Sequence, residues 1–251
     1  MLAHWPLLLK PDSRRALVIG LGSGITAGAA LRHPLKALEC AELSPAVVDA
    51  ARFFADFNYK VHDDERFALV VDDGRNYLER STGRYDVIIS EPSNPWIAGI
   101  GSLFTVEFFK NASARLNPGG VMAQWMHTYE MDPETFRMVL RTFRSVFPHV
   151  TLMQSQKFDV VMLGSNAPLD LDAEALEQRI QSPLVLEDLK SIGLANALAL
   201  AAHHYIPEEQ VALEAGQGPL NTDDHPLLEY MAPVGFYLGS TATQPATVHV
   251  N

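Results

Sequence analysis

The stretch Leu17-Val18-Ile19-Gly20-Leu21-Gly22-Ser23-Gly24 decides the fold of this chain. An apolar run ends in three alternating glycines, and the residues that follow favour a helix. Glycines let a strand turn sharply into a helix and bring bare backbone close to a ligand. The first N–H groups of that helix have no partner within it and can donate to the ligand. Which ligand binds depends on the groups at the ends of the later strands.

Composition and charge narrow the class of protein. The chain has 251 residues, 47% hydrophobic and 20% charged, which fits one large α/β domain or a domain with an appendage. The formal net charge of −11 disfavours nucleic-acid binding and is compatible with a cationic small substrate. The single cysteine, Cys40, excludes an internal disulfide and a cysteine-rich zinc site. Because no apolar run could span a bilayer and no basic segment precedes the apolar N-terminus, we expect a cytoplasmic chain without membrane insertion.

Strand-like and helix-like segments alternate along the first two thirds of the chain. We expect strands at 16–20, 37–42, 67–71, 85–90, 121–125, 150–154 and 158–163. Helices are expected at 24–32, 44–57, 75–80, 105–116 and 133–147, with a turn at 117–120. Ser44 and Pro45 fit an N-cap and a first helical residue. This alternation predicts a mostly parallel α/β sheet with helices on both faces and an antiparallel edge formed by the last hairpin.

The pattern changes after residue 166. Helical segments are expected at 171–180 and 183–200, and the last dozen residues, rich in Thr, Ala and Val, indicate a loose tail. We therefore expect a ligand-binding core at 1–166 and a helical extension at 167–251 that packs on it. Asp223 and Asp224, within the extension, are expected in a turn or helix cap before Pro226.

Polar groups follow four of the predicted strands, where an open α/β sheet binds its ligands. Glu42 ends the second strand, where an acid can accept both hydroxyls of a ribose. Asp73 and Gly74 follow the third strand, and the segment 91–96, restrained by two prolines, follows the fourth. The glycine spacing Gly-x-Gly-x-Gly differs from the Gly-x-Gly-x-x-Gly of nicotinamide dehydrogenases, and no phosphate loop is present. An adenosyl-methionine type of ligand fits this order of groups better.

The region from His4 to about Ser165 resembles the catalytic core of the spermidine synthase family. It is most similar to the bacterial spermidine synthase-like domains that are fused to membrane segments. The matching blocks are Val18-Ile-Gly-Leu-Gly-Ser-Gly24, Ala41-Glu-Leu-Ser-Pro-Ala-Val-Val48, Asp72-Asp-Gly-Arg-Asn-Tyr-Leu78, Tyr85-Asp-Val-Ile-Ile-Ser-Glu-Pro-Ser-Asn-Pro-Trp96, Ser102-Leu-Phe-Thr-x-Glu-Phe-Phe109 and Leu116-Asn-Pro-Gly-Gly120. The segment Leu220–Tyr230 also resembles the end of the fused proteins. The resemblance implies a methyltransferase-like (Rossmann-like) sheet of seven strands.

The resemblance also implies a reaction in polyamine biosynthesis. The family transfers an aminopropyl group from decarboxylated S-adenosylmethionine to an amine, and this chemistry requires no metal. It implies donor-binding roles for Gly20, Gly22, Ser23, Gly24, Glu42, Asp73 and Gly74. Glu91 matches the acid that receives the proton of the attacking amine, as base or electrostatic anchor. Asn94, Trp96, Gln124 and Tyr129 are expected on the side of the small acceptor.

The chain departs from the family pattern at three side chains. Ser23 stands where the family has an aspartate that contacts the donor ammonium, and Glu91-x-x-Asn94 replaces Asp-x-x-Asp. Each lost charge-assisted hydrogen bond is worth about 1.5–3 kcal/mol, so the loss of two would weaken a diamine complex by orders of magnitude. Serine at position 23 also removes repulsion toward the carboxylate of intact S-adenosylmethionine.

A further departure concerns the family's β-rich N-terminal domain, which contributes to the pocket and to dimerisation. In the family that domain precedes the point where this chain begins. We therefore expect this chain to be a standalone core, a fragment, or a cytoplasmic domain of a larger membrane protein. A homodimer belongs to the same set of expectations. Three hypotheses follow: an aminopropyltransferase-like enzyme, an S-adenosylmethionine-dependent methyltransferase, and a non-catalytic nucleoside-binding domain.

Overall fold

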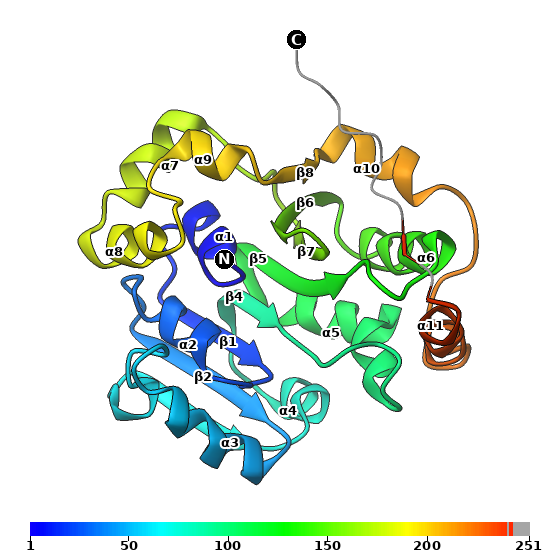
Figure 1. Ribbon diagram of the computed structural model, residues 1–251, viewed down its shortest axis with the longest axis horizontal. Coiled ribbons are helices and arrows are strands. Elements are labelled where there is room, and N and C mark those ends of the chain that lie inside the picture. Colours follow the sequence, from blue (N-terminus) through cyan, green and yellow to red (C-terminus); the bar gives the residue numbers. More distant parts are fainter. Residues whose placement is uncertain (240, 243–251) are drawn as a thin grey trace.

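The chain, shown as a computed structural model, forms an α/β fold around one mixed sheet; residues 1–239 and 241–242 are described (Figure 1). In these residues the sheet has eight strands in the order β3-β2-β1-β4-β5-β7-β6-β8. The strands are β1 Arg15–Ile19, β2 Ala37–Glu42, β3 Phe67–Val71, β4 Tyr85–Ser90, β5 Leu116–His127, β6 His149–Gln156, β7 Asp159–Ser165 and β8 His204–Ile206. Pairings from β3 to β5 are parallel, and those of β7 with β5, β6 with β7 and β8 with β6 are antiparallel.

Helices cover both faces of the sheet (Figure 1). Those with buried residues on one face are α1 His4–Leu9, α2 Ile25–Ala30, α3 Pro45–Ala51, α7 Ala173–Ile180, α8 Pro183–Ser191 and α9 Ala197–Ala201. Those on the other face are α4 Gly74–Arg80, α5 Val106–Arg115, α6 Pro133–Arg144, α10 Glu208–Ala215 and α11 Leu227–Leu238. Short 3-10 helices are η1 Arg52–Phe54, η2 Val61–Asp63 and η3 Ile100–Phe104.

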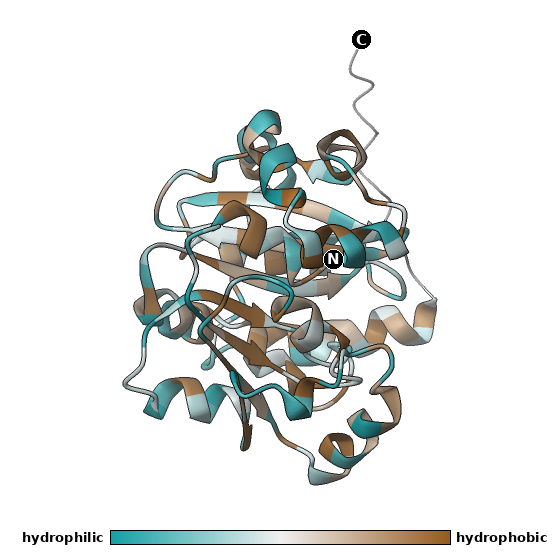
Figure 2. Ribbon diagram, turned by 90° about the vertical axis from the view of Figure 1, so that its left-hand side faces the viewer, coloured by the Kyte–Doolittle hydropathy of each residue, from teal (hydrophilic) through white to brown (hydrophobic). Residues whose placement is uncertain are grey.

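The central strands are apolar on both sides because each face of the sheet has its own hydrophobic core. Along β1, Ala16 and Val18 belong to one buried cluster, whereas Leu17 and Ile19 belong to the other. This is the alternation expected when successive side chains point to opposite faces. The strands accordingly stand out as hydrophobic in Figure 2, with hydrophilic residues mostly on the outer helices and loops. The predicted Rossmann-like α/β class is confirmed.

Several details of the predicted fold are wrong. The sheet has eight strands rather than seven, because β8, which the hydrophobic pattern did not reveal, pairs with β6. The predicted turn at 117–120 lies within β5, where the register with β4 shifts and Gly119 has a φ of 68°. This irregularity is a β-bulge, which accommodates the glycines while the strand continues past them.

Helix lengths also differ from the predictions. The helix expected at 44–57 is α3 followed by η1, although Ser44 caps it by accepting from the Val47 N–H, as predicted. The helix expected at 183–200 is divided into α8 and α9, because Gly193 adopts a φ of 78° and Asn196 caps a new helix. The helix expected at 133–147 ends at Arg144.

The C-terminal extension contains more structure than expected. The helices α10 and α11 lie in it, and the sequence patterns did not predict them. The division of the chain at residue 166 remains a prediction, and the expected loose tail lies almost entirely outside the described residues. Within residues 1–239 and 241–242, no helix has the length and apolar character needed to cross a membrane.

Candidate functional site

The loops that follow four strands meet at one edge of the sheet. Ile19 pairs with Ala41 on one side and with Ser90 on the other, and Ser90 in turn pairs with Gln124. The chain passes from β1 to β2 and β3, then returns across β1 to form β4, so the strand order switches between β1 and β4. Ligands of open α/β sheets bind beside such a switch. The predicted glycine loop and Glu91 lie on its two sides.

The glycine loop begins where two backbones approach closely. Gly20 has a φ of +93°, and a Cβ placed on it would lie 2.5 Å from the carbonyl oxygen of Glu91. No side chain fits there, so the loops after β1 and β4 depend on glycine at this position. Gly24 also has a positive φ and is the N-cap of α2. Gly22 has a φ of +53° and open space around it.

Glu42 supports the same loop from the end of β2. It is only 8% exposed, and its two carboxylate oxygens accept from the backbone N–H groups of Leu21 at 2.8 Å and Ser44 at 2.9 Å. Each oxygen of an ionised carboxylate has two acceptor sites, so both oxygens can also accept from a ligand hydroxyl. The backbone carbonyl of Ser23, in the same loop, accepts from the Asn58 amide at 2.9 Å. The predicted ribose site is therefore already held in place by the backbone.

Asp73 and Gly74 form the start of α4. Asp73 is the N-cap and accepts from the Asn76 N–H at 2.8 Å. It therefore has at least the structural role of a helix cap. A Cβ on Gly74 would lie 2.3 Å from Cγ2 of Ile19. Glycine at this position therefore allows α4 to pack closely against the end of β1. The structure thus brings Gly20, Glu42 and Gly74 together around the end of β1, as the sequence predicted.

Glu91 lies half-buried directly after β4. Burial raises the pKa of its carboxyl group, and the negative charge of Asp159 raises it further. The Thr26 hydroxyl and the α-amino group of Met1 act in the opposite direction on the same pKa. A carboxylate whose pKa is raised in this way is a better proton acceptor than an exposed one.

Sequence reasoning missed Asp159. It is the first residue of β7 and pairs with His127 at the end of β5, so it lies at the same edge of the sheet as Glu91. Burial raises the pKa of Asp159, and a bond from Trp125 lowers it. The available signal was an acidic residue inside an otherwise apolar segment, 158–163.

The side chains predicted on the acceptor side form an aromatic cluster. The Asn94 amide donates to the Tyr129 hydroxyl at 3.1 Å. The ring of Trp96 lies 4.6 Å from that of His127 and 5.8 Å from that of Tyr129, between centroids. His127 Nδ1 donates to the Tyr129 carbonyl oxygen at 2.8 Å, and burial lowers the pKa of His127 to about 4. Its imidazole is therefore neutral at pH 7, with a bare lone pair on Nε2.

Three buried polar atoms in this region have no hydrogen-bond partner. They are Ser90 Oγ, Gln124 Oε1 and His127 Nε2. Buried polar atoms are normally paired, so three unpaired ones on β4 and β5 mark this region as a candidate site. All three can accept a hydrogen bond, which fits a ligand rich in N–H groups. The position of His127 after the fifth predicted strand already indicated the acceptor side, whereas Ser90 was not among the predicted site residues, because a serine in a strand carries no distinctive sequence signal.

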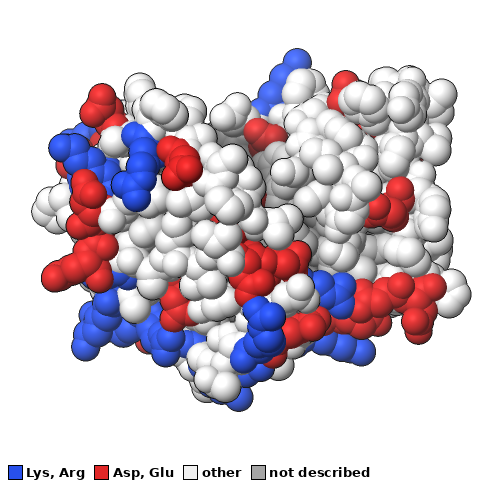
Figure 3. All heavy atoms as spheres, turned by 90° about the horizontal axis from the view of Figure 1, so that it is seen from below, with Lys and Arg blue, Asp and Glu red and all other residues white. Residues whose placement is uncertain are grey.

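Acidic and basic side chains are unevenly placed on the surface. Figure 3 shows a group of acidic residues near the centre of one face, beside a hollow, while basic residues lie mainly toward its margins. Such a surface attracts small cations. The expectation that no metal takes part remains a prediction.

Comparison with known proteins agrees with this geometry. Residues 1–156 match the spermine/spermidine synthase domain. The chain belongs to the spermine/spermidine synthase family. Over 123 residues it is 37% identical to the polyamine aminopropyltransferase of Klebsiella pneumoniae subsp. pneumoniae. The matched segment covers 48% of this chain and 43% of the relative. The chain thus spans less than half the length of that relative.

Solved structures resemble more of the chain than sequence relatives do. A spermidine synthase in complex with the transition-state analogue AdoDATO superimposes with a TM-score of 0.65 and 26% identity, covering 86% of this chain and 74% of that one. Human methyltransferase-like protein 13 in complex with SAH superimposes with a TM-score of 0.58 at 19% identity, covering 76% and 90% of the two chains. The second likeness concerns the fold alone, and it agrees with the methyltransferase-like sheet expected from the resemblance.

Proposed function

We propose that this member of the spermine/spermidine synthase family is a transferase that moves an aminopropyl group from decarboxylated S-adenosylmethionine to a small amine. The observation that supports this best is the set of three unpartnered buried acceptor atoms on β4 and β5, the first of which, Ser90, directly precedes Glu91. An amine or ammonium group supplies the N–H donors that these atoms lack. Their position across the strand switch from the glycine loop would place an acceptor beside the donor.

The donor would lie along the ends of β1, β2 and β3. Glu42 would accept from the ribose hydroxyls with the lone pairs that Leu21 and Ser44 leave free. Asp73 and Gly74 would face the adenine base, and the glycine loop, with Ser23, would face the rest of the donor. Because Glu42 is fixed by two backbone N–H groups before any ligand arrives, little side-chain entropy would be lost on binding.

The acceptor amine would meet Glu91 at the end of β4. Its nitrogen lone pair would form a bond to the aminopropyl carbon while the bond from that carbon to sulfur breaks. The electron pair of the broken bond stays on sulfur, and the sulfonium becomes the neutral thioether of methylthioadenosine. Glu91 would take the proton that the nitrogen loses, and such positioned bases contribute about 10²–10⁴-fold to rate. Asp159 would supply the second negative charge that Asn94 no longer provides.

Calorimetric titration with decarboxylated S-adenosylmethionine, intact S-adenosylmethionine and methylthioadenosine tests this proposal. We expect tighter binding of the decarboxylated donor than of the intact one, because the acidic edge disfavours the extra carboxylate. A clear preference for intact S-adenosylmethionine would overturn aminopropyl transfer. If none of the three binds at millimolar concentration, the glycine-loop site itself is wrongly assigned.

Methyl transfer is the second candidate, and Ser23 is the observation that favours it. The family aspartate at this position contacts the donor ammonium and repels a donor carboxylate, whereas serine does neither. Ser23→Asp should therefore raise the preference for the decarboxylated donor if the first proposal is right. The cytoplasmic location, a homodimer and a small diamine as acceptor belong to the same proposal, and a non-catalytic nucleoside-binding role is its remaining alternative.

A further inference from the structure

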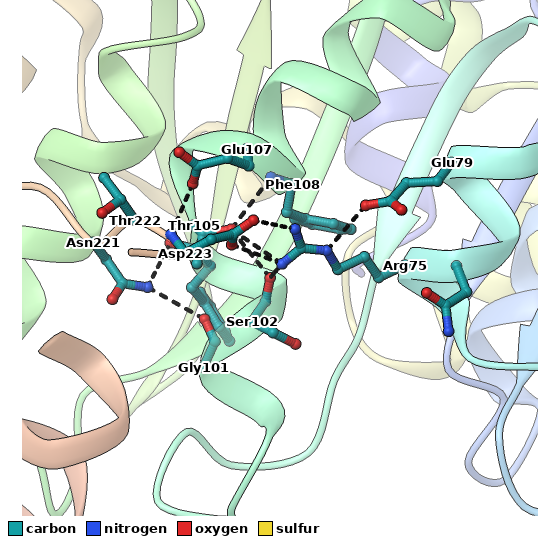
Figure 4. A network of polar contacts seen from close by, with 12 residues as sticks. Arg75, Glu79, Gly101, Ser102, Thr105, Glu107, Phe108, Asn221, Thr222 and Asp223 are labelled. Atoms are coloured by element: carbon teal, nitrogen blue, oxygen red, sulfur yellow. Dashed lines mark hydrogen bonds and ion pairs between the residues drawn. The ribbon is translucent and has the colours of Figure 1, made fainter. Parts of the chain in front are cut away.

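The segment 221–236, here called the C-terminal strap, contacts both halves of the candidate site. Figure 4 shows Asp223 of the strap facing the Arg75 guanidinium, which follows Gly74 directly in α4. Arg75 Nη1 donates to Asp223 Oδ1 at 2.8 Å, and Nη2 pairs with Oδ2. Arg75 Nη1 also donates to the Ser102 carbonyl oxygen at 3.1 Å, in the loop that leads from Glu91 to α5. Asp223 lies in a bend before Pro226, in keeping with the predicted turn, and its carboxylate has this additional role, which the sequence did not predict.

Asn221 connects the strap to the same loop through buried hydrogen bonds. Its side chain is completely buried, and its Nδ2 donates to the carbonyl oxygens of Gly101 at 3.2 Å and Phe104 at 3.1 Å. Its Oδ1 accepts from the Leu228 N–H at 3.1 Å, where α11 begins. Every polar atom of this side chain is thus paired, and η3 and α11 are joined through it.

Glu229 holds the outer part of the loop. Its Oε1 accepts from the Gly99 N–H at 2.7 Å, and a Cβ on Gly101 would lie only 2.8 Å from its Oε2. One face of α11 also reaches the acceptor side, because the ring of Phe236 lies 5.0 Å from the ring of Trp96. The strap therefore contacts the loop 91–104 at both Trp96 and Gly99.

We propose that the strap positions the acceptor loop, 91–104, and that Glu229 is the positioning residue for its outer part. The loop has little support of its own, since Ser93, Ile97, Ala98 and Gly99 are exposed. Glu229 satisfies the Gly99 N–H at the point where the loop turns with a φ of +88°. The loop in turn presents Asn94 and Trp96 to the acceptor. This inference rests on the proposed function for its effect on catalysis, but the contact itself can be tested without any substrate.

Amide hydrogen exchange followed by mass spectrometry tests the contact in the intact chain. Glu229→Ala removes the acceptor of the Gly99 N–H, and we expect exchange in peptides covering 97–104 to become about three- to tenfold faster, the equivalent of one lost hydrogen bond. Glu229→Gln keeps a carbonyl oxygen at the same place and should restore most of the protection. Tyr230→Ala is the matched control, because Tyr230 is 71% exposed and adjacent in sequence.

Kinetics separate positioning from a purely structural role. In Glu229→Ala we expect the KM for the amine to rise about three- to tenfold with a smaller change in kcat, because the acceptor loop would be less often in place. Binding of methylthioadenosine should stay within twofold of the wild-type value. Asp223→Asn against Asp224→Asn gives a second matched pair, since Asp224 is the exposed neighbour of the paired carboxylate.

Equal exchange rates in Glu229→Ala and Tyr230→Ala would overturn the inference, whatever the enzyme binds. Failure of the wild-type chain to bind any adenosyl compound would overturn the proposed function and leave the exchange result standing. A uniform rise in exchange across the whole chain in Glu229→Ala would show general destabilisation and count against positioning.

Discussion

The donor side and the acceptor side of the candidate site differ in how their polar groups are satisfied. On the donor side, Glu42 and Asp73 already accept hydrogen bonds from the backbone. On the acceptor side, Ser90, Gln124 and His127 keep buried polar atoms without partners. The first set is organised by the fold, whereas the second would find its partners in a ligand under the proposed function. We therefore expect substitutions on the donor side to alter folding and binding together, and those on the acceptor side to alter catalysis with little cost in stability.

Glu91→Gln should give the largest effect and the clearest separation of the two sides. We expect kcat to fall about 10²–10⁴-fold, because glutamine cannot take a proton from the amine. Methylthioadenosine binding, measured by calorimetry, should stay unchanged. The midpoint of thermal unfolding at pH 7 should rise, since the pKa of Glu91 is raised by burial and its ionised form therefore destabilises the folded state above the unfolded-state pKa.

Glu174→Gln is the control for this substitution, because Glu174 is exposed and distant in sequence from the site. Full turnover in Glu91→Gln would remove Glu91 as the proton acceptor. A loss of methylthioadenosine binding in that variant would show that the two sides are not separable in the way the hydrogen bonds suggest.

Glu42→Gln should produce the next largest effect, on donor binding. The glutamine amide would place donor hydrogens against the N–H of Leu21 or Ser44, and the charge-assisted bonds to both would be lost. At about 1.5–3 kcal/mol for such a bond, calorimetry should show methylthioadenosine binding weakened about ten- to a hundredfold. The unfolding midpoint should fall as well, in contrast to Glu91→Gln. Unchanged stability together with unchanged binding would contradict a preorganised donor side.

The same contrast explains what could be predicted from the sequence. The strands 37–42, 67–71 and 85–90 coincide with β2, β3 and β4, because strands of a parallel sheet are rich in apolar residues. Glu42 and the glycines were found for a related reason, since their roles depend on position next to such a run. Asp159 was not found as a site residue, because only the antiparallel pairing of β5 with β7 brings it to the edge. The strap contacts depend on pairs such as Arg75 and Asp223, which are 148 residues apart.

Asn94→Asp tests the acceptor side from the opposite direction, because it adds a carboxylate there. The new carboxylate could still accept from the Tyr129 hydroxyl, which now receives a bond from the Asn94 amide. We expect the KM for a diamine to fall about three- to tenfold, the value of one charge-assisted hydrogen bond over a neutral one. Steady-state kinetics with a diamine and a monoamine of equal length would check this, since the monoamine should gain less. An equal gain for both would indicate that the new charge acts on the reacting amine and not on the far one.

Asp159→Asn should give the smallest effect, a displacement of the pH profile. The charge of Asp159 raises the pKa of Glu91, so its removal should lower that pKa and favour the ionised form. Activity requires ionised Glu91 and falls as the pH drops through its pKa, so the acid limb of kcat/KM should move to lower pH. Asparagine can still accept the bond from Trp125, and Asp56→Asn serves as an exposed control with the same change in charge. A shift to higher pH, or an equal shift in both variants, would show that Asp159 does not act on Glu91 and that the acceptor side has only one effective carboxylate.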